Sequence, residues 1–447
     1  MSATSTTGRA ALVAANGRAR RPAEPPQGDL SHAEAQRDRE RRDLWFGEVP
    51  DGWEVKRLVS YFSERKVKVS DKDFPPLSVT KNGILPQLEN VAKTDDGDNR
   101  KLVRKGDFVI NSRSDRKGSS GLSEYDGSVS LINLVLKPRG GLFGAYCNYL
   151  LKSLSFVEEN YRNGRGIVAD LWTTRYDEMK MIKVVMPPLP EQKAIVAYLD
   201  AETGRIDKAI AAEEKMIALL QERREIVINE AVGGGDFSRK DRKERKGWEA
   251  STIRRHFDIT LGKMLCSNKL SDDYTLEKYF CAADVHFGDL ATTDNKQMWF
   301  SHKEKDQYLI KNGDLLIVEG GAGAGGACVV QGLKENFYIQ NSILRLRSRG
   351  TASERFVCYV LEGFVKRGYI EMACNKATIP HFTKEKVGDV PIPLPPLSEQ
   401  EAIVERLDRE TGKIDRAIEV KRRQIELLRE RRQIVIDEAV TGKVKVA

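Results

Sequence analysis

Residues 187–232 read PPLPEQKAIVAYLDAETGRIDKAIAAEEKMIALLQERREIVINEAV, and residues 395–440 repeat the phrase as PPLSEQEAIVERLDRETGKIDRAIEVKRRQIELLRERRQIVIDEAV. The two stretches are identical at 29 of 46 positions. Their spacing of 208 residues is far longer than the roughly 20–50 residues of a solenoid repeat. The chain therefore consists of two large related halves, and such a duplication predicts pseudo-twofold symmetry.

Both copies carry the local signals of a long helix. Prolines precede each copy, Glu191 lies in the first turn of the first copy, and Gly233 and Gly442 follow the two copies. A mostly apolar heptad pattern runs through them at Val196, Leu199, Thr203, Ile206, Ile210, Glu213, Ile217, Leu220, Arg224, Val227 and Ala231, and at Val404, Leu407, Thr411, Ile414, Ile418, Lys421, Ile425, Leu428, Arg432, Val435 and Ala439. This period predicts an antiparallel coiled coil between the copies. The alternative is a helix pair that serves only packing or dimerisation.

Gly204 and Gly412 interrupt the helix-forming residues of the two copies. Because glycine costs about 1 kcal/mol in a helix interior, we expect a kink or break at these positions. From Arg205 to Val232 the helix would measure roughly 42 Å. One turn of B-DNA is about 34 Å, so the helices could hold two domains one turn apart on a duplex.

Two registers are possible for the antiparallel helix pair, and they give the equivalent residues Glu213 and Lys421 different partners. If pairing runs from Glu191 to Val232, Glu213 lies close to Lys421. If it starts at Arg205, Glu213 faces Arg432 and Lys421 approaches Arg224. We favour the shorter pairing, because Gly204 and Gly412 interrupt the helices.

About 140 residues precede each copy, and they predict a mixed α and β domain in each half. Both domains begin with a Gly-Trp-Glu phrase, at Gly52 and at Gly247. Strand-like runs cover residues 107–110, 129–136, 314–318 and 342–346, and helix-like stretches cover residues 145–161 and 353–372. Because the rest of the two domains differs, the halves are expected to recognise different things.

The amino-acid composition indicates which binding partners and which cellular compartment suit the protein. The net charge of +8 permits nucleic-acid binding, and residues 236–247 form a linker with six basic and three acidic residues that could lie along phosphates or simply be solvated. Six irregularly spaced cysteines, with no apolar run of about 18 residues, favour a cytoplasmic protein without disulfides or metal. Residues 1–44 lack apolar periodicity and are expected to be a disordered tail.

Two polar segments in each half are candidates for contact with DNA. The first is basic and serine-rich at residues 112–118 and glycine-rich at residues 319–326. The glycine-rich loop fits G-x-G-x-x-G, but a strand rather than a helix is expected after it, so no dinucleotide site is predicted. The second segment spans residues 163–167 and 374–381, which are equivalent places when counted by 208.

Arginine, lysine and serine suit phosphate or base-edge hydrogen bonds, and glycine permits close backbone approach. The candidate DNA-binding residues are Ser112, Arg113, Ser114, Arg116, Lys117, Arg162, Arg165, Lys263, Gly323, Lys376, Thr378 and His381. Ordinary turn chemistry is the alternative explanation of these loops. No catalytic, cofactor-binding or metal-binding residue is assigned.

The repeated Pro-Pro-Leu-x-Glu-Gln helix, the repeated Gly-Trp-Glu start and the repeated Gly-Asp strand motif at Gly106 and Gly313 resemble the specificity subunit of type I restriction-modification systems. The resemblance covers residues 45–443. It implies an α+β fold, in which two mixed α/β target recognition domains are joined by two long antiparallel helices that form a pseudo-twofold coiled coil.

The implied domain order is a tail (1–44), target recognition domain 1 (45–186), a conserved helical region (187–235), the basic linker (236–247), target recognition domain 2 (248–394) and a second helical region (395–443). The resemblance further implies a non-catalytic subunit that recognises a bipartite, asymmetric sequence in double-stranded DNA. It would have no cofactor of its own. Its partners would be two adenine-N6 methyltransferase subunits, which use S-adenosylmethionine, and restriction and translocation subunits, which use ATP and magnesium.

Two other classes of function stay open at this point. The chain has no Asn/Asp-Pro-Pro-Tyr methyltransferase motif, no Walker A lysine motif and no clear Pro-Asp…Glu-x-Lys nuclease pattern. An enzyme with unrecognised motifs would modify or cut DNA on its own. A coiled-coil scaffold without base recognition would bind unrelated duplex equally well. Neither class explains two different domains inside one repeated frame.

Overall fold

The computed structural model describes residues 45–446 except residues 88–96, 114–115, 167–171, 234–247, 292–295 and 375–380. It divides into two compact units, each of which is described by itself. Unit 1 contains the residues up to Glu202 together with residues 433–447, and unit 2 contains Thr203–Arg432. The predicted tail (1–44) and basic linker (236–247) lie outside the described residues.

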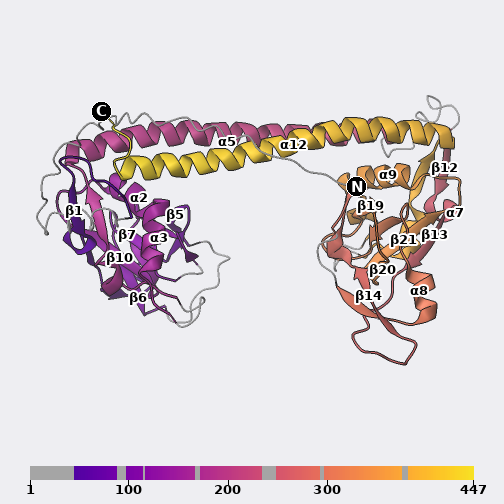
Figure 1. The fold of residues 1–447 in the computed structure, drawn as a ribbon, viewed down its shortest axis with the longest axis horizontal. Helices are drawn as coiled ribbons and strands as arrows, with labels where there is room; N and C mark the ends of the chain where they lie inside the picture. Colours follow the sequence, from indigo (N-terminus) through magenta and orange to yellow (C-terminus); the bar gives the residue numbers. More distant parts are fainter. Residues whose placement is uncertain are drawn as a thin grey trace, which may run out of the picture. The chain divides into compact units, whose positions relative to one another are not determined.

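The described elements of unit 1 form a frame of antiparallel strands with helices on one face (Figure 1). In chain order they are β1 (Glu54–Arg57), η1 (Leu58–Ser60), β2 (Phe62–Glu64), β3 (Lys68–Val69), β4 (Leu77–Thr80), β5 (Gly83–Pro86), β6 (Arg100–Val103), β7 (Phe108–Asn111), β8 (Ser120–Leu122), β9 (Gly127–Ser130), β10 (Asn133–Pro138), α2 (Gly144–Lys152), α3 (Leu154–Arg162), α4 (Tyr176–Met179), β11 (Lys183–Met186) and the start of α5 (Leu189–Val232).

The described elements of unit 2 repeat this frame with additions. In chain order they are β12 (Glu249–Thr252), α7 (Ile253–His256), β13 (Phe257–Leu261), β14 (Thr275–Phe280), η4 (Ala282–Asp284), β15 (Val285–His286), β16 (Asp289–Leu290), β17 (Gln297–Phe300), α8 (His302–Tyr308), β18 (Leu315–Val318), β19 (Ala327–Val329), β20 (Tyr338–Ile339), β21 (Ile343–Ser348), α9 (Glu354–Lys366), α10 (Tyr369–Ala373), α11 (Lys384–Asp389), β22 (Pro391–Leu394) and most of α12 (Leu397–Val440).

Each unit has a four-stranded antiparallel sheet of the same design, β2-β10-β7-β8 in unit 1 and β13-β21-β18-β19 in unit 2. Side chains alternate across a strand, so β7 sends Phe108 and Ile110 towards the helices and Val109 into a second, smaller core. Strand β18 does the same with Leu315 and Leu316. Burial on both faces explains why these strands are continuous apolar runs.

The repeated Gly-Asp motif forms the turn that leads into this central strand. Gly106 and Gly313 have φ angles of 89° and 97°, which favour glycine. Asp107 accepts a hydrogen bond from the backbone N–H of Arg104 at 2.8 Å and pairs with Arg65 at 2.7 Å. Asp314 accepts equivalent bonds from residues 311 and 347. The motif is therefore structural.

The Glu-Gln of the repeated phrase joins each domain to the start of its helix. Gln192 is fully buried, where its Oε1 accepts from the Phe143 N–H at 2.9 Å and its Nε2 donates to the Pro187 carbonyl at 2.9 Å. Gln400 repeats both bonds in unit 2, with Ser353 and Pro395 at 2.8 Å. Each glutamine satisfies the backbone at the N-terminus of α2 or α9, which sequence analysis did not foresee.

The predicted elements are present, with three differences. The helix-like run 145–161 is divided at Ser153, whose Oγ caps α3, and the run 353–372 is divided at Gly368 with φ 78°. The strand-like run 129–136 is two strands, β9 and β10, separated by a turn. Apolar periodicity alone predicts longer helices and strands at these three places. The regular elements end there because of a side-chain cap, a left-handed glycine and a turn.

The expected break at Gly204 and Gly412 was wrong, because α5 and α12 are each continuous over 44 residues. Thr203 and Thr411, next to these glycines, are buried at 4% and 3% exposure, and every heptad position from Thr203 to Ala231 is buried or half-buried. Burial of the heptad face offsets the local cost of one glycine.

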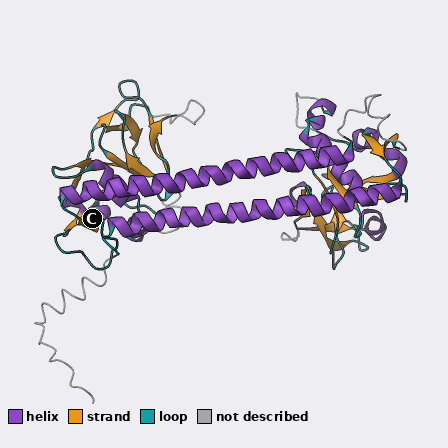
Figure 2. Cartoon of the chain, turned by 90° about the horizontal axis from the view of Figure 1, so that it is seen from above, coloured by secondary structure: helices purple, strands orange, loops and turns teal. Residues whose placement is uncertain are grey.

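The two helices pair antiparallel within unit 2 (Figure 2). Glu213 lies 2.9 Å from Lys421, and Arg432 lies 2.9 Å from Asp207. The favoured shorter register is therefore wrong, since Glu213 meets Lys421 as in the longer pairing. Arg224 instead pairs with Glu362 of α9 and with Asp415 at 2.9 Å. Without a break at glycine, pairing is not confined to residues after 205.

The end of α12 completes the core of unit 1. Ile436, Ala439 and Val440 are buried there, and the Val440 carbonyl accepts a hydrogen bond from the Tyr146 hydroxyl at 3.2 Å. Asp437 beside them accepts from the Ser155 N–H at 3.2 Å. Burial raises the pKa of the Asp437 carboxyl, although hydrogen bonds from Ser155 and Ser153 act in the opposite direction.

Candidate nucleic-acid interface

The two polar segments predicted in the first half lie together in unit 1. Arg165 and Thr173 exchange backbone hydrogen bonds at 2.9 Å, and the Thr174 N–H donates to the Ser112 carbonyl at 3.0 Å. Thr173 also forms an antiparallel bridge with Arg113. The loop after β7 and the loop after α3 therefore form one surface, which we call the loop junction of unit 1.

Unit 2 has the same junction at equivalent positions. The Phe382 N–H donates to the Glu319 carbonyl at 2.6 Å, and Gly320 forms an antiparallel bridge with His381. Phe382 and His381 are 208 residues after Thr174 and Thr173. The backbone connection is thus duplicated while its side chains differ.

Basic side chains surround the loop junction of unit 1. Arg113 and Arg116 are exposed, and the side chains of Arg162 and Arg165 are 74% and 83% exposed with weakly held partners at Glu159 (3.1 Å) and Glu178 (3.4 Å). Lys117 is more enclosed, because its Nζ pairs with Glu158 at 2.7 Å and lies 4.4 Å from the Tyr161 ring centroid. Exposed guanidinium groups of this kind can bind phosphates.

An open groove of about 430 Å³ adjoins this surface. Its basic lining residues are Lys66, Lys101, Arg113 and Arg175, and its acidic ones are Glu64 and Asp177. Glu64 is engaged by Lys101 at 3.3 Å, and Asp177 by Lys180 at 2.6 Å. Residues 66, 101 and 175 were missed by sequence analysis, because they come from three separate segments without a shared motif.

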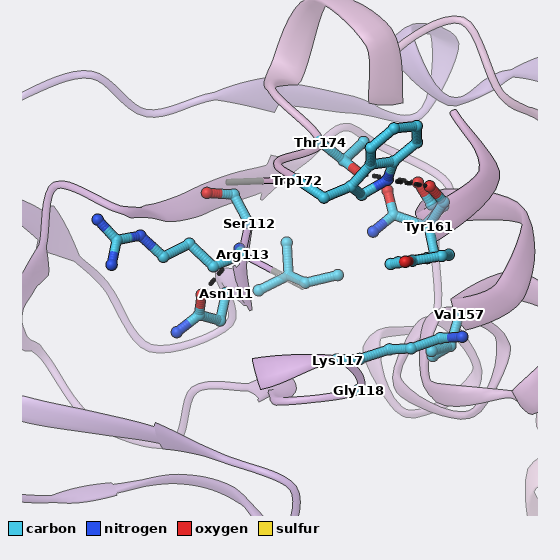
Figure 3. A pocket seen from close by; sticks show the side chains of 11 residues that line it. Asn111, Ser112, Arg113, Lys117, Gly118, Val157, Tyr161, Trp172 and Thr174 are labelled. Carbon is cyan, nitrogen blue, oxygen red and sulfur yellow. Dashed lines mark hydrogen bonds between the residues drawn. The ribbon is translucent and has the colours of Figure 1, made fainter. Parts of the chain in front are cut away.

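On its other side the junction closes over a small pocket of about 20 Å³ (Figure 3). Trp172 and Tyr161 lie 5.9 Å apart by ring centroids, and the Trp172 Nε1–H donates to the Tyr161 carbonyl at 2.8 Å. Gly164 is required here, since a Cβ at this position would collide with Trp172. Figure 3 shows the Arg113 side chain extending away from both rings.

The remaining predicted residues of unit 1 have mixed positions. Ser112 does not offer its hydroxyl to a ligand, because its Oγ donates to the Ile132 carbonyl at 2.5 Å. It holds the loop in place. Ser114 lies outside the described residues. Arg113, Arg116, Arg162 and Arg165 are therefore the predicted residues that the junction brings together with exposed side chains.

In unit 2 the predicted residues are less uniform. His381 is at the junction, where its Nδ1 lies 3.4 Å from a Glu319 carboxylate oxygen. Gly323 is in the turn before β19, and its carbonyl accepts from the Gly326 N–H at 2.9 Å. Strand β19, not a helix, follows this glycine-rich loop, as predicted. Lys376 and Thr378 lie outside the described residues.

Lys263 does not fit the role predicted for it. It is buried to 8% exposure, its ammonium pairs with Glu304, and the rings of Tyr274 and Phe300 lie 4.8 Å and 5.2 Å away. A lysine engaged in this way has no charge available for a phosphate. Its backbone forms an isolated parallel bridge with Gln340 within the domain.

The described residues contain no group of three His, Cys, Asp or Glu side chains able to hold a metal ion. In the same part of the chain, no helix combines the length and apolar character needed to cross a membrane.

Comparison with known proteins gives one consistent family. Residues 245–428 match the model of the type I restriction modification DNA specificity domain. The putative type I restriction enzyme MjaX specificity subunit of Methanocaldococcus jannaschii is 23% identical over 441 residues, which cover 90% of this chain and 96% of the relative. The EcoKI specificity subunit of Escherichia coli is 22% identical, covering 81% and 83%.

Two solved structures share the fold. A chain from a study of complex assembly and conformational transition of the type I R-M system has a TM-score of 0.69 at 18% identity, covering 89% of this chain and 100% of that chain. The HsdS subunit from Thermoanaerobacter tengcongensis has a TM-score of 0.50 at 21% identity, covering 89% and 98%.

Proposed function

We propose that this chain, which resembles the specificity subunits of type I restriction-modification systems over about nine-tenths of its length, recognises a bipartite, asymmetric sequence in double-stranded DNA. Residues 45–186 and 248–394 are then target recognition domains 1 and 2. The chain itself is non-catalytic. It directs two adenine-N6 methyltransferase subunits, and the restriction and translocation subunits, to the DNA site.

The observation that carries this proposal is the duplicated loop junction with unlike side chains. Thr174 bonds to Ser112 in unit 1 as Phe382 bonds to Glu319 in unit 2, so the scaffold is the same. Arg113 in one junction is replaced by Gly320 in the other. A backbone arrangement that is kept in both domains while its side chains differ suits recognition of two different half-sites. A coiled-coil protein without base recognition would not need different side chains at the two junctions.

The outer face of the helix pair supports docking of partner subunits. Met216, Leu219 and Ile226 of α5 and Val420 and Leu427 of α12 are 40–56% exposed. They recur at spacings of three and seven residues, which is a second apolar stripe besides the one buried in the coiled coil. Leu219 and Leu427 are equivalent by the 208-residue repeat, so one stripe per helix matches two copies of one partner.

Co-expression with the cognate methyltransferase subunit, followed by mapping of methylated adenines, tests the proposal. The expected result is a bipartite motif with two unlike half-sites. The purified chain alone should neither methylate nor cut DNA, and activity of the chain alone would favour the enzyme class. Equal binding of specific and unrelated duplex would favour the scaffold class.

Partner docking has a separate test in the mass of the complex. Leu219→Lys and Leu427→Lys are each expected to lose one methyltransferase copy, and the double variant both copies. Gln221→Lys, at an exposed position of α5 on the face opposite Leu219, is the control. An unchanged mass of the complex in the double variant would mean that the outer apolar stripe does not bind the methyltransferase subunits.

A further inference from the structure

The small pocket beneath the loop junction of unit 1 contains a buried acceptor without a donor. Asn160 is 8% exposed and lines the pocket, and its side-chain oxygen Oδ1 has no hydrogen-bond partner among the described residues. Leaving such a buried atom unsatisfied is unfavourable, because it has lost its hydrogen bond to water. The pocket therefore requires a small group that can donate a hydrogen bond.

The size of the pocket limits that group. About 20 Å³ accommodates one water molecule or one group of similar size. An extruded base or a cofactor does not fit. The rings of Tyr161 and Trp172 and the β-strand end at Asn111 enclose the space, so the donor is either a water molecule or a small group that projects into the pocket from a larger molecule outside.

The surroundings indicate the kind of molecule. Arg113 and Lys117 also line the pocket, and the exposed Arg165 pairs through its backbone with Thr173, next to Trp172. The exposed Arg113 and Arg165 suit an anionic backbone beside the pocket, whereas the Lys117 ammonium is already paired with Glu158. In the major groove of DNA, adenine N6 and cytosine N4 are the base groups that donate hydrogen bonds.

We propose that the pocket receives the exocyclic amino group of one adenine or cytosine in the half-site of domain 1, and that Asn160 Oδ1 accepts its hydrogen. This rests on the proposed function and names a specificity-determining residue for it. In the free protein a water molecule fills the same place and is displaced by the amino group. Domain 2 does not share the device, because neither α9 (Glu354–Lys366) nor α10 (Tyr369–Ala373) contains an asparagine.

The test uses the complex with the cognate methyltransferase and the map of methylated adenines. Asn160→Leu has nearly the same shape without the acceptor. One position of the domain 1 half-site that is A or C in the wild type is expected to become degenerate, with methylation of the original sites reduced roughly 5- to 150-fold, as for a base contact of 1–3 kcal/mol. The half-site of domain 2 stays unchanged.

Asn160→Asp keeps an acceptor at the same place. It should select cytosine at that position, because a carboxylate accepts from cytosine N4 and repels the adenine N7 lone pair. This variant carries the test if Asn160→Leu does not fold. The matched control is Asn148→Leu on α2, since the Asn148 Oδ1 accepts from the Leu122 N–H and the residue lines neither the pocket nor the loop junction.

Two outcomes overturn the inference in different ways. An unchanged motif with wild-type methylation in the Leu variant, or in the Asp variant where that one carries the test, would mean that the pocket holds a structural water only. A wild-type complex that yields no bipartite motif would overturn the proposed function, and the inference with it.

Discussion

Lys421 contacts Glu213 at 2.9 Å, and the two residues occupy the same position in the two copies of the repeat. Contact between equivalent residues means that they lie on the local twofold axis of the helix pair. In a pair of identical helices this arrangement would bring like charges together. Here the two copies differ at this position, Glu in one and Lys in the other, so the coiled-coil seam contains an ion pair instead of two like charges.

Glu213→Lys should destabilise unit 2, because it places two ammonium groups at this axis. Lys421→Glu in the same protein reverses the pair and should restore stability. We expect a coupling free energy of about 0.5–1 kcal/mol in a double-mutant cycle measured by chemical denaturation. Equal rescue by Arg432→Glu, whose side chain pairs with Asp207, would contradict the register.

Gln192→Ala and Gln400→Ala should each destabilise their own unit. Either change leaves a part-buried N–H and a buried carbonyl without their partners, and a buried unsatisfied group costs about 1–3 kcal/mol. Hydrogen exchange resolved by segment would show the loss in residues 143–152 for the first variant and 353–366 for the second. Lys193→Ala, at the exposed neighbour of Gln192, should leave exchange unchanged.

The two long helices and their buried face could be predicted from the sequence, but the absence of a break at the glycines could not. Heptad spacing alone identified the buried positions from Thr203 to Ala231. The propensity cost of Gly204 is a local quantity, whereas the helix is held by burial of Thr203 and Ile206 on either side. A Cβ at Gly204 would meet nothing within 4 Å, so no close approach requires glycine there and nothing in its surroundings marks a break.

The site was predictable in outline and not in detail. Counting by 208 placed the second polar segments of both halves at equivalent positions, and both join the first segments. Asn160 and Trp172 carry no motif, because the pocket that they line is formed by the end of β7, the loop after it, α3 and the segment around Trp172. Lys263 was assigned by charge type alone, which cannot tell an exposed lysine from one paired with Glu304.

Arg113→Ala and Arg165→Ala should weaken binding to specific and unrelated duplex alike. Each lost phosphate contact should reduce the slope of log affinity against log salt by about one unit. Titration of the complex at several salt concentrations measures both effects. The control is Lys56→Ala, at an exposed residue of β1 that pairs with Glu54. Unchanged salt slopes in both arginine variants would mean that the loop junction does not contact DNA.

Exchange of residues 53–186 for the corresponding part of a relative should change one half-site and preserve the other. Base contacts at well-separated positions contribute roughly additively, and the junctions of the two domains are built separately. Mapping of methylated adenines gives both half-sites in one experiment. Simultaneous change of both would show that the domains do not specify independently.

Asp437→Asn should raise the melting temperature at pH 7. A folded-state pKa above the unfolded one means that the folded protein disfavours the ionised carboxylate, so ionisation lowers stability above the folded pKa. The gain should shrink as pH falls through the folded pKa and disappear below the ordinary value of 3.8. Thermal scans from pH 3 to 8 measure this trend.

Asp177→Asn is the matched control for that experiment. The pKa of Asp177 is lowered by its hydrogen bond with Lys180, so ionisation there favours the folded state. Its replacement should reduce stability at pH 7, and the deficit should fade towards acid. The same pH response in both variants would contradict the assignment of Asp437.

Unit 1 contains the earliest described residues of the chain and also its last ones. Phe46 and Tyr146 share a core with Ile436, Ala439 and Val440, whereas unit 2 is the single segment Thr203–Arg432. On the ribosome, the usual order in which the N-terminal domain is completed first is therefore reversed. The first domain to be translated must wait, with part of its apolar surface uncovered, until the final turns of α12 emerge.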